Sequence, residues 1–149
     1  MSFVLPKQSF LALAAIGWVD GSLQRIEAEG LTRAAKEGGL GEADIAEIEK
    51  ATKTKQDIES LEVSGLGKWE QVLTYALGAW FAQLDGVVST SEHETLVALG
   101  NKLGLDEPLR KRAAAAAYDI SCLPDGGKPA RYDFAKLVVR LKEKLPQVA

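Results

Sequence analysis

The chain has 149 residues, of which 46% are hydrophobic and 26% charged, and its formal net charge is −3. These are ordinary values for one globular domain, and they argue against a chain that is disordered throughout. The acidic balance also argues against nucleic-acid binding as the main task, because binding a phosphate backbone needs concentrated positive charge. Cys122 is the only cysteine, so neither an internal disulfide nor a site of several thiolates can form.

The sequence shows no membrane or secretion signal. Its first residues lack the charged segment and apolar core of a secretory signal. The apolar stretch 10–19 is too short to span a bilayer. We therefore expect a cytoplasmic protein without direct membrane insertion.

Apolar residues recur at helical spacing in the first third of the chain and predict three helices. The first covers about 7–19. The second carries Ile26, Ala28, Leu31, Ala34 and Ala35 on one face and should end at Gly38-Gly39. The third covers about 42–52, with Ile45 and Ile48 facing inward.

A polar connector, 53–67, follows and is expected to hold a short helical piece at 57–61. The next predicted helix covers 68–84. Another starts at the cap residue Ser89 and reaches about 103, and one capped by Asp106 ends near 121.

The C-terminal part begins with a Pro/Gly loop, and Asp133 starts a last amphipathic helix that ends near 145. Basic residues gather in this region and are predicted to form a solvated helix face. They are Lys128, Arg131, Lys136, Arg140, Lys142 and Lys144.

An internal repeat organises this helical chain. A shift of 65 residues superposes Asp20-Gly21 on Asp85-Gly86, Glu27 on Glu92 and Glu29 on Glu94, together with four further identities. Each copy is predicted to form a helix, a sharp Asp-Gly turn and a second helix, followed closely by a third. We therefore predict an all-α, single-domain bundle of about seven helices over 1–149. Its halves are about 7–52 and 68–121, and its C-terminal helix is about 133–145.

The spacing of the repeated acids matches the second half of an EF-hand calcium loop. When Asp20 stands at loop position five, Glu27 falls at position twelve, the place of the bidentate glutamate. Asp85 and Glu92 occupy the same places in the second copy. Positions one and three carry no carboxylate in either copy, so we expect weak binding of calcium or magnesium. The predicted metal ligands are Asp20, Glu27, Asp85 and Glu92, with Glu29 and Glu94 as weaker candidates.

The same acids also have a structural interpretation. Ser89 and Glu92 form a capping box, and the helix dipole favours Glu27 in a first turn. Glu29 can pair with Arg33, four residues later. Turn and cap roles, or a cation or partner site, therefore both stay open for these residues.

The segments Ala14–Gly21 with Glu27, and Ala79–Gly86 with Glu92, resemble the TerB-like tellurite-resistance family. That family also includes the N-terminal part of some membrane-anchored DnaJ-type co-chaperones. The resemblance implies an all-helical fold with an acidic surface. It also implies a role in stress or metal-oxyanion resistance, through divalent cations and a membrane-associated partner complex.

No catalytic constellation accompanies these acids. His93 is the only histidine and is expected on the surface, and Cys122 has no sequence partner that would mark it as a nucleophile. We therefore expect a non-enzymatic stress or tellurite-resistance module that binds divalent cations weakly. The alternative is a protein-interaction module, co-chaperone-like or a scaffold for a membrane complex, with no metal role.

Overall fold

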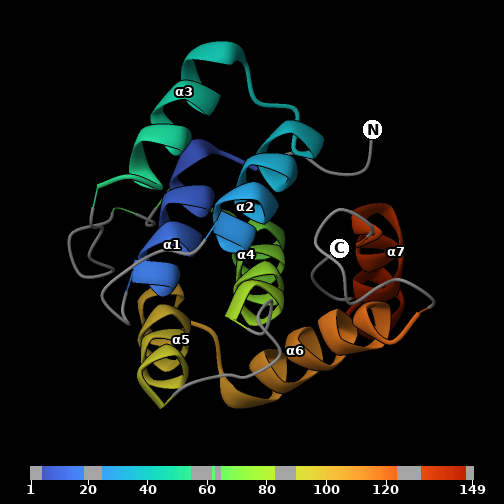
Figure 1. Ribbon diagram of the computed structural model, residues 1–149. Helices are drawn as coiled ribbons and strands as arrows, with labels where there is room; N and C mark the ends of the chain where they lie inside the picture. Colours follow the sequence, from blue (N-terminus) through green and yellow to red (C-terminus); the bar gives the residue numbers. More distant parts are fainter. Residues whose placement is uncertain are drawn as a thin grey trace.

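The computed structural model describes residues 5–18, 25–54, 62, 65–82, 90–123 and 132–146. Within these ranges the chain forms seven α-helices and no strand, so the predicted all-α domain is confirmed (Figure 1). The helices are α1 (Lys7–Trp18), α2 (Arg25–Glu37), α3 (Glu42–Ala51), α4 (Lys68–Ala82), α5 (Thr90–Leu103), α6 (Glu107–Ser121) and α7 (Phe134–Lys144).

Two aspartates begin helices as the sequence predicts. The Asp106 carboxylate accepts a hydrogen bond of 3.1 Å from the Leu109 N–H and so caps α6. Asp133 caps α7 in the same way, through the Lys136 N–H at 3.0 Å. Each cap satisfies a backbone donor that the first helical turn leaves without an intrahelical partner.

Two glycines one repeat apart end α2 and α5. Gly39 has φ +78° and Gly104 has φ +73°, in the left-handed region that favours glycine. In each case the N–H of the following leucine donates to a carbonyl in the last turn, at 3.4 Å after α2 and 3.1 Å after α5. The end predicted for the second helix at Gly38-Gly39 is therefore confirmed.

The helices α1 and α4 form the buried centre of the molecule. The Ser9 and Thr74 hydroxyl groups, 65 residues apart in sequence, form a buried hydrogen bond of 2.8 Å. Further along the pair, Ile16 lies against Gly78. Contacts at a nearly constant sequence offset mean that the two helices run in the same direction, as Figure 1 shows. Both therefore end on the same side of the molecule.

One pair of repeat-equivalent positions in α1 and α4 carries side chains of different size. A Cβ atom at Gly78 would lie 3.2 to 3.3 Å from side-chain atoms of Leu96, Leu99 and Ile16. Leu13, which occupies the same place in the first repeat, is completely buried. The close approach of the helices at Gly78 therefore depends on the missing side chain.

The two halves share part of their packing. The helix α2 contacts α1, and α5 contacts α4 in the equivalent way. Ile48 of α3 and Ala113 of α6, one repeat apart, are both fully buried. The third helices differ, because α3 lies against α1 and α2, whereas α6 packs on α4 and α7 (Figure 1).

The C-terminal helix is tied to both halves. The Trp80 ring of α4 lies 4.9 Å from the Tyr132 ring and 5.1 Å from the Phe134 ring, measured between centroids. From α2, Arg33 donates a hydrogen bond of 2.8 Å to the Tyr132 carbonyl. The same guanidinium lies 4.8 Å from the centroid of the Phe134 ring.

One residue departs from the predicted apolar stripe of α2. Ile26 is 38% exposed, whereas the neighbouring Glu27 is buried. The buried stripe continues through Leu31 and Ala34, and Ile26 lies about 100° round the helix from Glu27. The helical piece expected at 57–61 and the predicted helix ends at Val19 and Leu84 fall outside the described residues.

Candidate functional site

The repeated acids stand at the starts of two helices. Glu27 lies in the first turn of α2, and Glu92 lies in the first turn of α5. Asp20 and Asp85 fall outside the described residues. Because α1 and α4 run in parallel, their last described residues, Trp18 and Ala82, lie on the same side of the molecule.

Both glutamates are withdrawn from solvent. Glu27 is 4% exposed and Glu92 is 2% exposed. Glutamate is almost never buried this deeply unless it is paired, because the cost of desolvating a carboxylate must be offset by charge or hydrogen bonds. Each of the two side chains has polar interactions of this kind. The repeat therefore preserves the buried carboxylate as well as the residue type.

The weaker candidates behave differently. Glu29 and Glu94 are both exposed. The Glu29 carboxylate accepts a hydrogen bond of 3.0 Å from Arg25. The predicted pair of Glu29 with Arg33 is wrong, because Arg33 reaches toward the C-terminal segment and lies 3.8 Å from Glu37. These two acids can meet a partner in solution but do not share the environment of Glu27 and Glu92.

The helix residues before the first turn have structural roles. Ile16, at the place of the first EF-hand ligand, is fully buried. Trp18, at the place of the third, donates its indole N–H to the Ala51 carbonyl at 2.8 Å. Any cation at this turn would thus depend on Asp20, Glu27 and groups from elsewhere. Within the described ranges no three acidic, histidine or cysteine side chains converge, and His93 is exposed as predicted.

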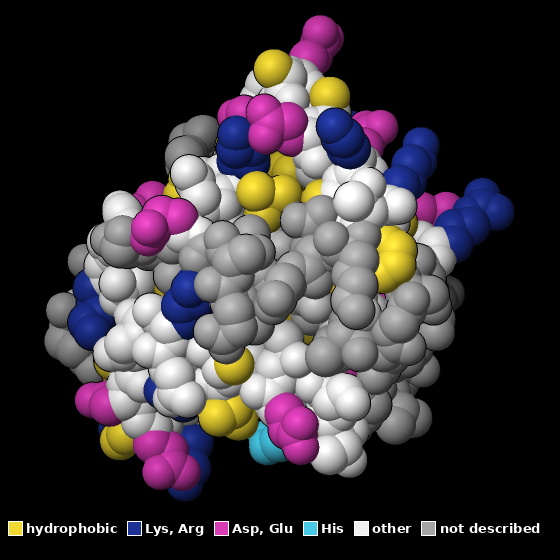
Figure 2. Space-filling model, turned by 90° about the vertical axis from the view of Figure 1, so that its left-hand side faces the viewer, with side chains coloured by type: hydrophobic (Ala, Val, Ile, Leu, Met, Phe, Trp, Pro, Cys, Tyr) yellow, Lys and Arg dark blue, Asp and Glu magenta, His cyan; other side chains and the backbone are white. Residues whose placement is uncertain are grey.

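Charged side chains of both signs lie around the face shown in Figure 2, which is the left-hand side of Figure 1. Acidic and basic groups are interspersed among the described side chains of this face. The acidic surface that the family resemblance implies is therefore mixed in charge here.

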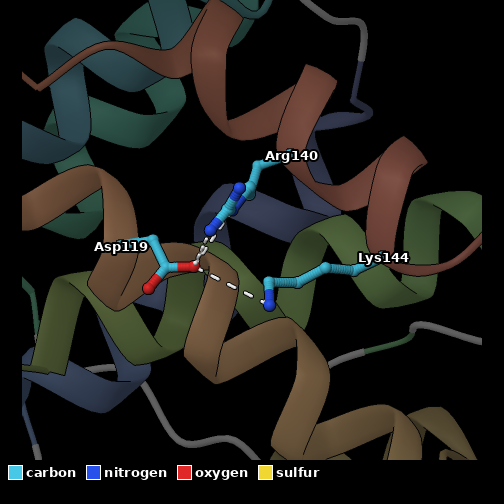
Figure 3. Close-up of polar contacts among 3 residues, drawn as sticks. All are labelled: Asp119, Arg140 and Lys144. Atoms are coloured by element: carbon cyan, nitrogen blue, oxygen red, sulfur yellow. Dashed lines mark hydrogen bonds and ion pairs between the residues drawn. The ribbon is translucent and has the colours of Figure 1, made fainter.

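Part of the C-terminal basic face is neutralised by one carboxylate. Arg140 donates to Asp119 Oδ2 from Nε at 3.0 Å and from a terminal nitrogen at 2.9 Å. Lys144 lies 3.8 Å from the same oxygen (Figure 3). All three side chains are at least one third exposed, so these pairs join α6 to α7 but contribute little to stability.

A second cluster was not anticipated from the sequence. Four basic side chains, Arg25, Arg33, Lys36 and Lys53, line a cleft between α2 and the end of α3. Arg25, Arg33 and Lys36 are spaced at 8 and 3 positions along one helix, which places them on one face. The sequence shows this spacing, but it does not show which residues form the opposite wall of the cleft.

No protein-family model, curated protein or solved structure matches the chain. The resemblance to the TerB-like family accordingly stays a prediction that these comparisons do not support. None of the helices in the described ranges combines the length and the apolar character needed to cross a bilayer.

Proposed function

We propose that the protein is a non-enzymatic TerB-like module that binds a divalent cation weakly through the carboxylates of its two Asp-Gly elements. The ligands would be Asp20 and Glu27 in the first half and Asp85 and Glu92 in the second. The role that follows from the resemblance is in stress or tellurite resistance.

The observation that carries this proposal is the paired burial of Glu27 and Glu92. Two glutamates one repeat apart are 4% and 2% exposed, each in the first turn of the helix after an Asp-Gly pair. A carboxylate held in such a place is already desolvated and oriented, which lowers the cost of ordering it around a cation. Calcium and magnesium take oxygen ligands of this type.

Calorimetric titration of the chain with calcium and with magnesium tests the proposal. At an ion concentration tenfold above Kd, binding to the folded state alone adds about 1.4 kcal/mol, so the melting temperature should rise by roughly 3 to 6 °C. Replacement of both aspartates, Asp20→Asn with Asp85→Asn, should abolish the binding heat and the rise.

The matched control is Glu42→Gln with Glu107→Gln, two glutamates one repeat apart that are not predicted ligands. These residues lie in the same repeats and remove the same charge, but they are exposed. The control should keep the ion-dependent rise. No rise at millimolar ion, or an equal loss in the control, would rule out the cation site.

A protein-interaction role without a metal is the second candidate. Val97 of α5 is 40% exposed and Tyr118 of α6 is 54% exposed, so each of these helices presents one apolar side chain to solvent. This candidate predicts that the chain captures a protein partner in the presence of a chelator, and that Val97→Ser with Tyr118→Ser weakens the capture. Capture of the partner only when calcium or magnesium is added would contradict this second candidate.

A further inference from the structure

The helices α2 and α3 run in opposite directions (Figure 1). An open cleft of about 580 Å³ lies between α2 and the end of α3. One wall is the face of α2 that runs from Arg25 to Lys36. The other is the last turn of α3 with the residues that follow it, 49–53. The α2 wall spans 11 residue steps, or about 16 Å of helix.

Positive charge is in excess in this cleft. Four cationic side chains line it, Arg25, Arg33, Lys36 and Lys53, against the two carboxylates Glu29 and Glu49. The described lining residues therefore carry an excess of two positive charges, in a chain whose net charge is −3. Concave surfaces lined by one sign of charge concentrate ions of the opposite sign.

The cations differ in how they are held. Arg33 is fixed by its hydrogen bond to the Tyr132 carbonyl and by its position over the Phe134 ring. Arg25 forms an ion pair of 3.0 Å with the exposed Glu29 carboxylate. Lys36 and Lys53 are exposed and have no ion-pair partner among the described residues. Their ammonium groups are thus available to a ligand.

The second repeat provides an internal comparison. The positions equivalent to Arg25, Arg33, Lys36 and Lys53 carry Thr90, Ala98, Asn101 and Tyr118. None of these is basic, although the helices that carry them derive from the same pattern. The repeated fold therefore does not require cations at these positions, and Lys36 and Lys53 have no structural partner among the described residues that would account for them.

The chemistry of the walls limits the ligand. No described lining residue is aromatic, so the cleft offers no stacking surface. The hydroxyls of Thr32 and Thr52 already donate to the Ala28 and Glu49 carbonyls, at 3.0 Å and 2.6 Å. The available side-chain donors are the guanidinium and ammonium groups, which bind oxyanions through charge-assisted hydrogen bonds.

We propose that the α2–α3 cleft binds a small polyanion that carries phosphate or carboxylate groups. Lys36 and Lys53 approach it from the two walls, and Arg33 adds a positive charge whose position is fixed. None of the four proposed cation ligands is among the described residues that line the cleft, and the cleft takes ions of the opposite charge.

Calorimetric titration of the full chain with pyrophosphate and with citrate tests this site. Lys36→Gln with Lys53→Gln should weaken binding by at least about tenfold, because two charge-assisted contacts are lost. The control Lys50→Gln with Lys68→Gln removes the same charge from exposed lysines outside the cleft and should bind as the wild type does. Melting curves of both variants verify that they are folded.

The carboxylate of Glu49 gives a second test with the opposite sign. Glu49→Gln removes a negative charge from the lining, so the polyanion should bind several-fold more tightly. Binding of pyrophosphate alone would assign the cleft to phosphates, and binding of citrate alone would assign it to carboxylates. Absence of binding by both anions, or equal weakening in the Lys50/Lys68 control, would overturn the proposal.

Discussion

Ser9 and Thr74 stand one full repeat apart, and their hydroxyl oxygens lie 2.8 Å from each other in the middle of the core. Each residue is completely buried, so each hydroxyl depends on the other for its hydrogen bond. Contact between two repeat mates means that the equivalent helices α1 and α4 pack side by side in register at this point. The contact therefore supports the predicted duplication with geometry as well as with sequence identities.

Loss of one hydroxyl from this pair should destabilise the protein. Ser9→Ala leaves the Thr74 hydroxyl buried without its partner, which should lower the free energy of unfolding by about 1–3 kcal/mol. The double variant Ser9→Ala with Thr74→Val should cost less than the sum of the single changes. Urea denaturation of the three variants measures this coupling, and strictly additive effects would contradict it.

The first turn of α3 lacks the side-chain cap that the equivalent helix, α6, has, and a substitution can supply it. Gly41 has φ −76° and ψ 171° and provides no side-chain cap, whereas Asp106 has φ −76° and ψ 166° and caps α6. Gly41→Asp should therefore raise the free energy of unfolding by a few tenths of a kcal/mol, to about 1 kcal/mol at most. Gly65→Asp adds the same charge at a residue outside the helices and should bring no gain; thermal unfolding compares the two.

Gly100 leaves room for the side chain of Arg110. A Cβ atom at this position would lie 2.6 Å from Arg110 Nε, and Arg110 is held by hydrogen bonds of 2.8 Å to the Leu105 carbonyl and to Asn101. Gly100→Ala should displace the Arg110 side chain from these partners and so lower the free energy of unfolding by about 1 kcal/mol, after the better helix propensity of alanine has offset part of the loss. In an Arg110→Ala background the same change should raise the free energy of unfolding by about 0.5–1 kcal/mol, because alanine is the better helix former. Equal losses in both backgrounds would show that Arg110 is not the cause.

High pH should weaken the docking of α7 through Tyr132. Burial raises the pKa of the Tyr132 phenol well above its usual range, and the hydroxyl donates to the Ala117 carbonyl at 3.0 Å. The unfolded chain ionises near pH 10, so the folded state then binds more protons and stability falls as the pH rises further. Tyr132→Phe should flatten this alkaline slope of the unfolding free energy. An unchanged slope in Tyr132→Phe would mean that other groups cause the loss of stability at high pH.

The helices and their ends were readable from the sequence because local chemistry determines them. Asp106, Asp133 and the Gly38-Gly39 pair act on backbone groups within a few residues, and the structure confirms all three. The repeat offset also predicted which helices are equivalent. These features need no knowledge of how distant segments approach each other.

The burial of Glu27 was not predicted, because a pattern of apolar residues treats every glutamate as outward-facing and favoured Ile26 instead. The role of Arg33 was not predictable either, since its carbonyl partner lies 99 residues away in sequence. The same holds for the α2–α3 cleft, whose basic side chains come from two elements. Such features depend on tertiary placement, which periodicity alone does not specify.

The contrast between Leu13 and Gly78 bears on the history of the duplication. Of the three side chains that crowd Gly78, Leu96 and Leu99 belong to the same half, and only Ile16 comes from the other half. The residues equivalent to Gly78 and Leu99 in the first half are Leu13 and Ala34, and both are completely buried. Each half therefore combines one large and one small residue, in reversed positions, so a change in one member of such a pair calls for the matching change in the other if the core is to stay filled.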